Sequence, residues 1–128
     1  AKRGVDVRIV IPGIPDKKIV YTLSESHIEP LAKAGVKVYK YTPGFVHAKV
    51  FVSDDKIATV GTINLDYRSL YLHFECGIYM ENCKCISDVK NDLIQTIEKS
   101  KELNKKEVEP SLLKGIFQAL LRLLAPLM

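Results

Sequence analysis

Apolar and other side chains alternate at the start of the chain, which is typical of a strand. Val7, Ile9 and Ile11 occupy alternate positions and predict a strand over residues 5–11. The Pro-Gly-Ile-Pro run that follows, at 12–15, ends that strand because proline cannot donate to a β-ladder.

Helical spacing replaces the alternation after this turn. Apolar residues recur every three or four positions and predict one helix over residues 19–33. Asp16 is suited to cap its N-terminus, and Gly35 is suited to end it. An apolar run at 36–39 then predicts a second strand. Strand, helix and strand in this order predict a parallel crossover.

The middle of the chain predicts a β-hairpin. Residues 45–53 form an apolar, β-branched run that Asp-Asp-Lys at 54–56 interrupts as a turn does. Residues 57–60 then return as a second strand. A Gly-Thr-Ile-Asn loop at 61–64 follows, and it brings a hydroxyl and a carboxamide to the end of the hairpin where the first strand begins.

The last third of the chain predicts a strand and two helices. Residues 71–80 alternate again, Ser87 could cap a helix, and Pro110 fits the first turn of a final helix after a charged segment at 99–109. The core-facing side chains of the strand are predicted to be Leu72, Phe74, Cys76 and Ile78. The opposite face is predicted to carry His73, Glu75 and Gly77.

These elements predict an α/β fold with a mixed β-sheet flanked by helices. We expect residues 1–109 to form the folded domain and residues 110–128 to form a C-terminal amphipathic helix. Its narrow polar stripe consists of Lys114, Gln118 and Arg122. Such a helix is expected to pack in a groove of the domain or to lie at a membrane surface.

Composition adds modest constraints. The net charge of +4 suits an anionic ligand or membrane surface, although scattered lysines are also typical of a solvated exterior. Three cysteines, an odd number, argue against a disulfide framework, and the isolated pair Cys83 and Cys85 predicts no zinc site. No run of about 20 apolar residues is present. The start at Ala1 leads almost directly into a strand, so we interpret the chain as a fragment of a longer protein.

His47 and Lys49 are the first candidate functional residues. They are two positions apart in the hairpin's first strand, so both side chains are expected on one face. Thr62 and Asn64 belong to the loop that follows the second strand. The four side chains could therefore converge on one phosphate group.

The spacing of these residues resembles the signature of the phospholipase D superfamily. That signature is His-x-Lys, four residues, Asp, six residues, Gly-Ser/Thr and then Asn. It is matched here by His47, Lys49, Asp54, Gly61, Thr62 and Asn64. Threonine replaces the more frequent serine. The flanking segments look like the C-terminal half of bacterial cardiolipin synthases, which resemble two such halves behind N-terminal hydrophobic segments.

The resemblance implies phosphodiester chemistry with two histidines, one from each half. One forms a phosphohistidine and the other protonates the leaving alcohol. We expect His47 to be the general acid and then the base for the incoming alcohol, with the nucleophile role left open. Lys49 and Asn64 would hold the phosphate oxygens, and Thr62 would donate a supporting hydrogen bond.

Two acidic residues complete the predicted catalytic set. Asp54 lies at the hairpin turn, where we expect it to brace the loop. Glu75 is the candidate to orient His47, because a carboxylate on the ring's other nitrogen fixes the tautomer. His73 replaces the asparagine that cardiolipin synthases tend to have, and its role stays open.

The function implied is phosphatidyl transfer between two phosphatidylglycerol molecules, giving cardiolipin and glycerol. The expected partners are this anionic phospholipid, the missing N-terminal half of the same chain and the bacterial cytoplasmic membrane, with no nucleic acid, metal or cofactor. The fragment itself is expected to be soluble, and inactive unless it pairs as a homodimer.

Three alternatives remain open. The first is another phospholipase D-type phosphatidyltransferase, such as a phosphatidylserine synthase, or a hydrolase. The second is a single-motif dimeric nuclease that uses the same histidine and lysine. The third is a degenerate interaction module without activity. The acceptor alcohol and the balance of transfer to hydrolysis are likewise not fixed by the sequence.

Overall fold

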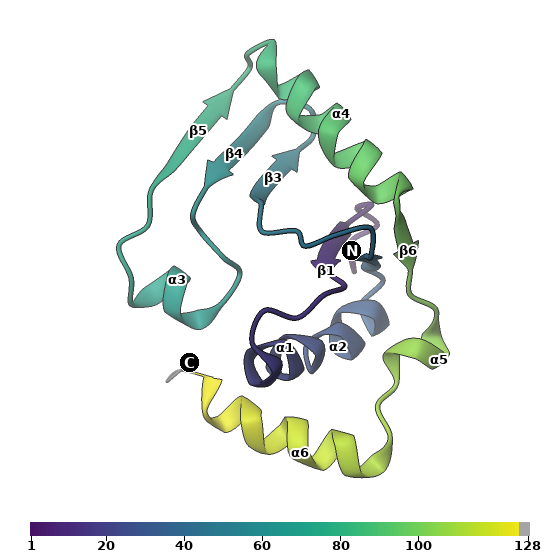
Figure 1. The fold of residues 1–128 in the computed structure, drawn as a ribbon. Coiled ribbons are helices and arrows are strands. Elements are labelled where there is room, and N and C mark those ends of the chain that lie inside the picture. Colours follow the sequence, from purple (N-terminus) through teal and green to yellow (C-terminus); the bar gives the residue numbers. More distant parts are fainter. Residues whose placement is uncertain (126–128) are drawn as a thin grey trace. The chain divides into compact units, whose positions relative to one another are not determined.

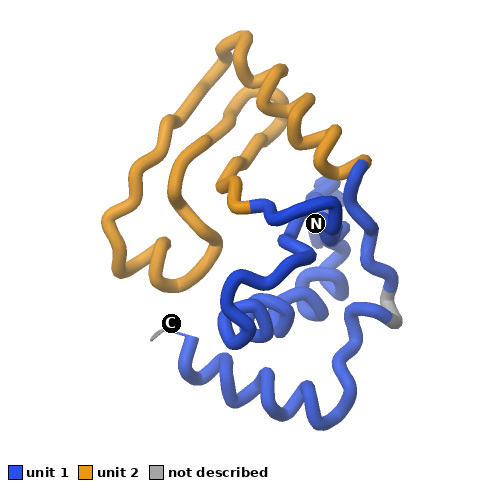
Figure 2. The backbone as a smooth tube through the Cα atoms, in the orientation of Figure 1, with its two compact units in different colours: residues 1–46, 99–128 blue, residues 47–98 orange. Residues whose placement is uncertain are grey.

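The computed structural model describes residues 1–125, with the backbone alone at 105–106. Figure 2 shows two compact units: unit 1 consists of residues 1–46 and the part from 99 onward, and unit 2 of residues 47–98. In chain order the elements are β1 (Arg8–Pro12), α1 (Lys18–Glu25), α2 (Ile28–Lys33), β2 (Lys37–Tyr41), β3 (Lys49–Ser53), β4 (Ile57–Gly61), α3 (Tyr67–Tyr71), β5 (Gly77–Glu81), α4 (Cys85–Glu98), β6 (Ser100–Glu102), α5 (Lys105–Val108) and α6 (Leu112–Leu123) (Figure 1).

Unit 1 is built on a mixed sheet with the strand order β1-β2-β6. β1 and β2 are parallel, with Val10 opposite Tyr39, and the two helices α1 and α2 connect them. The predicted parallel crossover is therefore confirmed. β6 adds to the other edge of β2 in the antiparallel direction, with Glu102 opposite Tyr39.

The single helix predicted over 19–33 is wrong, because the structure has two helices separated at Ser26 and His27. Pro30 explains the break. A continuous helix would place its ring against the carbonyl of Ser26 and leave that carbonyl without its helical donor. At the break, the hydroxyl of Ser26 donates to the carbonyl of Leu23 at 2.6 Å. The N-cap also differs, since α1 begins after Lys17 rather than at Asp16.

The end of α2 follows the prediction. Gly35 has φ +92°, a left-handed conformation that glycine adopts without steric cost. The amide of Gly35 donates to the carbonyl of Ala32 at 3.0 Å, and that of Val36 to the carbonyl of Leu31 at 3.1 Å. These two bonds form a Schellman motif, which turns the chain directly into β2.

Unit 2 is built on an antiparallel sheet with the strand order β3-β4-β5, and α4 packs against β3 and β4. The predicted hairpin is confirmed as the β3–β4 pair, in which Ser53 lies opposite Ile57. Ala58 on β4 and Ile86 on α4 are each 1 % exposed and form the centre of this unit's core.

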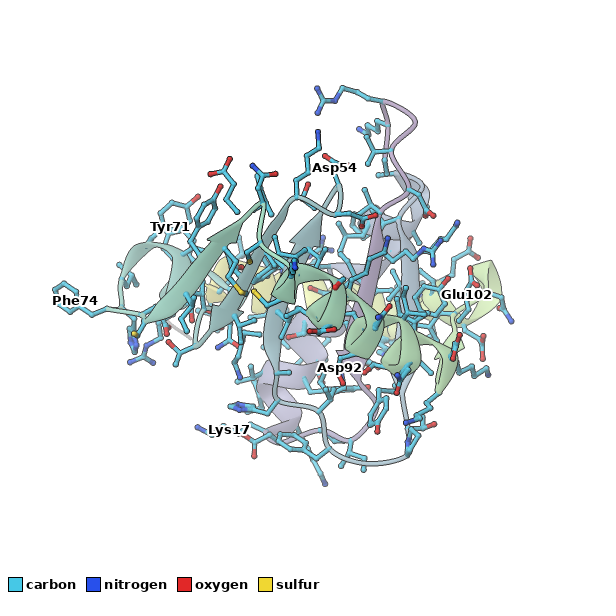
Figure 3. The ribbon with its side chains drawn as sticks, turned by 90° about the horizontal axis from the view of Figure 1, so that it is seen from above. Lys17, Asp54, Tyr71, Phe74, Asp92 and Glu102 are labelled. Carbon is cyan, nitrogen blue, oxygen red and sulfur yellow. The ribbon has the colours of Figure 1, made fainter. Side chains whose placement is uncertain are left out.

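The strand predicted over 71–80 is wrong in its first part. α3 occupies Tyr67–Tyr71, and β5 begins only at Gly77. All four side chains expected in the core are exposed: Leu72, Phe74, Cys76 and Ile78. Figure 3 shows Phe74 projecting away from the chain. Asp66 accounts for the first residue of this segment, because its carboxylate accepts from the amide of Ser69 at 2.7 Å and starts the helix that ends at Tyr71.

The C-terminal boundaries also differ from the prediction. α4 begins at Cys85 and contains Ser87, which therefore does not cap it. The charged segment at 99–109 forms β6 and the short α5. Ser111 is the N-cap of α6, so Pro110 precedes that helix. The last three residues of the segment predicted at 110–128 lie outside the described residues.

The predicted α/β class is confirmed. Within residues 1–125 the strands form one mixed and one antiparallel sheet, each with helices packed on it, rather than a single mixed sheet. No helix in this part of the chain combines the length and apolar character needed to cross a bilayer.

Candidate active site

The site is built on the open end of the β3–β4 hairpin. Lys49, the first residue of β3, lies opposite Gly61 on β4, and Gly61 lies opposite Gly77 on β5. Cross-strand neighbours normally place their side chains 4.5–5.5 Å apart at the Cβ atoms, as a general rule of sheets. Both residues that follow Lys49 in this row are glycines, so neither β4 nor β5 contributes a side chain beside it.

Gly61 also permits an unusually close approach of β4 and β5. A Cβ atom at this position would lie 2.3 Å from the carbonyl oxygen of Cys76 and 2.5 Å from the Cα of Gly77. Both atoms belong to the backbone, so no side-chain rotation could relieve the overlap. The glycine of the motif is therefore required by packing, and it fixes where Thr62 leaves the strand.

The amide and the hydroxyl of Thr62 both form hydrogen bonds with the segment before β5. Its amide donates to the carbonyl of Cys76 at 2.9 Å, and its hydroxyl oxygen accepts from the amide of Cys76 at 3.0 Å. The same hydroxyl donates to the carboxylate of Glu75. This geometry explains why a hydroxyl residue is needed after Gly61, and either serine or threonine would provide it.

Glu75 is held as an ionised carboxylate. Its hydrogen bonds with Thr62 and then with Ser69 lower its pKa below the usual value, and the charge of Lys49 acts in the same direction. Desolvation opposes the shift and is the weaker effect.

Asn64 joins the same cluster through Ser69. Its side-chain amide donates to the Ser69 hydroxyl at 3.4 Å, and that hydroxyl in turn bonds Glu75. Sequence reasoning did not single out Ser69. The signal for it was the spacing of Asp66 and Ser69, which is typical of an N-cap and its first-turn amide. This short helix folds the chain back so that Ser69 reaches the loop.

The prediction that His47 and Lys49 share a strand is wrong, because β3 begins only at Lys49. The ammonium of Lys49 donates to the backbone carbonyl of His47 at 2.6 Å. His47 itself lies in the segment that leads into β3, two residues before the strand begins. The hydrogen bonds of the Glu75 carboxylate are with the hydroxyl groups of Thr62 and Ser69. The orientation of the His47 ring by Glu75 therefore stays a prediction.

His73 has a defined partner at the edge of the cluster. The guanidinium of Arg68 donates to its Nε2, so the ring in this geometry carries its proton on Nδ1. Asp66 and Arg68, two residues apart, have separate roles, since Asp66 caps α3 and Arg68 holds the His73 ring.

Asp54 lies at the opposite end of the hairpin from Lys49. It and Asp55 have φ values of 51° and 57°, and the amide of Lys56 donates to the carbonyl of Ser53 at 3.1 Å, as in a type I′ turn. At about 3.4 Å per strand residue, this end is roughly 15 Å from the cluster. Asp54 therefore shapes the turn, as expected of a bracing residue.

A metal centre is not part of this arrangement. Among the residues that the structure describes, no three His, Cys, Asp or Glu side chains gather in a way that could hold an ion. The polar groups that meet at the site are instead an ammonium, a carboxamide, a hydroxyl and a carboxylate, contributed by Lys49, Asn64, Thr62 and Glu75. The ammonium and the neutral donors among them match the non-bridging oxygens of a phosphate diester.

Comparison with known proteins supports this interpretation. Residues 1–97 match the family described as "Cardiolipin synthase, PLD-like domain". A cardiolipin synthase of Halalkalibacterium halodurans is 36 % identical over 100 % of this chain, and cardiolipin synthase 1 of Bacillus cereus is 39 % identical over 98 %. An uncharacterized protein of Streptococcus mutans is 48 % identical over 100 % of the chain.

These relatives are much longer proteins. The chain covers 26 % of the Halalkalibacterium enzyme, 25 % of the Bacillus enzyme and 28 % of the Streptococcus protein. It therefore spans about a quarter of the length of the curated relatives it matches. The family match extends over both units, from β1 to the last turns of α4, and so includes the whole of the cluster described above. The chain is a member of the cardiolipin synthase family and carries its phospholipase D-like domain.

Proposed function

We propose that this chain is one catalytic half of an enzyme that transfers a phosphatidyl group between two phosphatidylglycerol molecules, giving cardiolipin and glycerol. The observation that carries the proposal is the cluster of Lys49, Thr62, Asn64 and Glu75 beside a row of glycines. The names of the Halalkalibacterium and Bacillus relatives support this choice of substrate.

The reaction would proceed in two displacements at phosphorus. A histidine from the other half attacks the phosphate of the first phosphatidylglycerol, forming a phosphorus–nitrogen bond while the bond to glycerol breaks. His47 protonates the departing glycerol oxygen. The now neutral His47 then takes the proton from a hydroxyl of the second phosphatidylglycerol, whose oxygen displaces the histidine and forms cardiolipin.

Electrostatic stabilisation is the role of the remaining cluster. Lys49 and Asn64 would bind the non-bridging oxygens, where charge concentrates as the bonds exchange. Thr62 fixes the loop through Cys76 and Glu75. Glu75 would orient the His47 ring by accepting a hydrogen bond from its other nitrogen, which fixes the tautomer.

The proposal includes the setting in which this half works. Its partners are the missing N-terminal half of the same chain and the surface of the bacterial cytoplasmic membrane. Residues 1–109 are the catalytic half-domain, and 110–128 are the helical segment that follows it. The isolated chain is expected to be inactive because it supplies a single catalytic histidine, unless two copies pair.

The test uses the chain alone and as a graft. The purified chain is incubated with phosphatidylglycerol vesicles, and cardiolipin is measured by mass spectrometry; little should form. The chain is then placed into the Bacillus cereus relative in exchange for its matching segment, where cardiolipin formation should return. In the graft, His47→Ala should lower turnover by about 10²–10⁴-fold, the usual worth of general acid–base catalysis, and Glu75→Gln by less.

A control and two contrary results keep the test decisive. His27→Gln removes a histidine from unit 1 and should leave turnover unchanged. Full turnover by the His47→Ala graft would refute the catalytic assignment. Cleavage of DNA by the chain alone as a dimer, without cardiolipin formation by the graft, would establish the single-motif nuclease in its place.

A further inference from the structure

Helix α6 has two chemically distinct sides. With about 100° per residue, seven large apolar residues fall within an arc of roughly 140°. They are Leu112, Leu113, Ile116, Phe117, Leu120, Leu123 and Leu124. The opposite side carries the predicted polar stripe together with Leu121 and small residues. An amphipathic helix of a globular domain normally turns the apolar side toward the core.

In unit 1 the helix is packed with its polar stripe inward. Gln118 is 4 % exposed, and Leu121 beside it is buried. The ammonium of Lys114 bonds the carboxylate of Glu25, at the end of α1, at 2.9 Å. Lys40 on β2 approaches the other oxygen of the same carboxylate at 3.5 Å. Glu25 therefore bridges the helix to the sheet and fixes which side of α6 faces the unit.

The ionisation of Glu25 is consistent with its ion pairs to Lys114 and Lys40. Burial on its own would raise the pKa of the carboxyl group, but the hydrogen bond and charge of Lys114 and the charge of Lys40 outweigh it, so the pKa is lowered. The carboxylate is charged at neutral pH and can form both ion pairs. The inward face of α6 is thus set by specific polar contacts rather than by apolar packing.

The apolar side of α6 is consequently exposed as one continuous surface. Leu112 and Leu113 are 81 % and 80 % exposed, and the other five residues of the arc are between about half and three-quarters exposed. Figure 1 shows α6 running alongside α1, which it contacts. Ile19 and Val20, near the start of α1, are exposed as well. We call the seven residues of the arc the α6 apolar face.

Cations lie next to exposed apolar residues on the same unit. Lys17 and Lys18 are exposed at the start of α1, directly before Ile19 and Val20. Figure 3 shows Lys17 at the edge of the molecule. Arg122 on α6 is exposed as well, at the C-terminal end of the polar stripe. An apolar face accompanied by lysine and arginine is the combination that binds the interface of an anionic bilayer.

We propose that the α6 apolar face inserts into the surface of a membrane rich in anionic phospholipid. A docking site for a folded protein partner would be expected to carry polar groups that form roughly one hydrogen bond per 100–200 Å². The seven side chains of the arc offer none, whereas acyl chains require none. The inference deepens the proposed function, because it names the surface that would hold the domain at its lipid substrate.

Vesicle binding tests the proposal without any need for turnover. The 128-residue chain should sediment with phosphatidylglycerol vesicles, and more weakly with phosphatidylcholine vesicles. Phe117→Glu should weaken the partition to phosphatidylglycerol by about tenfold or more, because it removes an inserted ring and adds a negative charge. The matched control is Phe74→Glu, which makes the same change at an exposed phenylalanine of unit 2 and should bind as the original chain does.

Further variants separate the contributions and the possible failures. Lys17→Gln with Lys18→Gln should reduce the preference for phosphatidylglycerol over phosphatidylcholine. His47→Ala should bind vesicles normally, so a failure of the catalytic proposal would leave this one standing. Leu120→Ser serves as a milder variant if Phe117→Glu loses its melting transition. Unchanged binding by both α6 variants would overturn the proposal, as would their conversion of a dimer into a monomer with no effect on vesicles.

Discussion

Replacing Gly61 with alanine should disrupt the candidate site through packing alone. The added Cβ would lie 2.3 Å from the carbonyl oxygen of Cys76, a separation that real contacts do not reach, so β4 and β5 must move apart. That movement stretches two hydrogen bonds that join Thr62 and Cys76, one between backbone groups and one from the Cys76 amide to the Thr62 hydroxyl. At about 1 kcal/mol per bond, with a further cost of about 1 kcal/mol for overpacking, the loss of stability should be about 2–3 kcal/mol.

Thermal unfolding followed by circular dichroism measures this loss. For a chain of this size about 1 kcal/mol corresponds to roughly 4 °C, so Gly61→Ala should lower Tm by about 8–12 °C. Gly44→Ala is the matched control, because a Cβ there meets nothing within 4 Å, and its Tm should stay the same or rise slightly. If the two variants melted within about 2 °C of each other, the close approach of β4 and β5 would be refuted.

Two further predictions concern single contacts. Thr62→Val should raise the pKa of Glu75 toward its ordinary value, because it removes the largest cause of the lowered pKa; an NMR titration of the carboxyl carbon would show this. Since the folded-state pKa is the lower one, the stability that Glu75 contributes is present above its ordinary pKa and is lost as pH falls through the lowered value, and Thr62→Val should lessen that loss. Asp66→Ala should cost about 1 kcal/mol in urea unfolding because it removes the cap of α3, whereas Asp66→Asn should retain most of the stability; equal losses would contradict the capping role.

Local patterns predicted the parts of the fold that local rules determine. The hairpin turn needs two left-handed residues, and consecutive aspartates tolerate that conformation, so 54–56 could be identified as a turn. Gly35 likewise marked the end of a helix. The motif spacing placed Lys49 and Thr62 near each other because the hairpin register follows directly from the length of its loop.

Elements that depend on distant partners could not be predicted in this way. β6 has the sequence Ser-Lys-Glu, which carries no apolar signal, and it is a strand only because β2 offers an edge. The strand predicted at 71–80 begins only at Gly77, because the helix capped by Asp66 ends at Tyr71 and the chain between them pairs with no strand within residues 1–125. The break at Ser26 was readable from Pro30, but apolar periodicity obscured it.

The candidate site shows the same division. The motif identified its cationic and amide groups, whereas Ser69 and the contact between Arg68 and His73 depend on how α3 folds back. For α6, the amphipathic pattern was correctly identified. The pattern shows which residues share a side of the helix, but it does not show which side packs against the unit. Which side faces the unit depends on Glu25, a residue far away in the sequence.

The order of strands in unit 1 has a consequence for biosynthesis. β2 and β6 are neighbours in one sheet, yet all of unit 2 lies between them in the chain. A ribosome must therefore complete unit 2 before the third strand of unit 1 exists. Unit 2 pairs only strands adjacent in sequence, so it can fold as it emerges, while closing the long loop to β6 costs about 3–4 kcal/mol in chain entropy. During this interval the edge of β2 that later pairs with β6 has no partner strand. The early folding of unit 2 shortens the distance that the chain must bridge between β2 and β6.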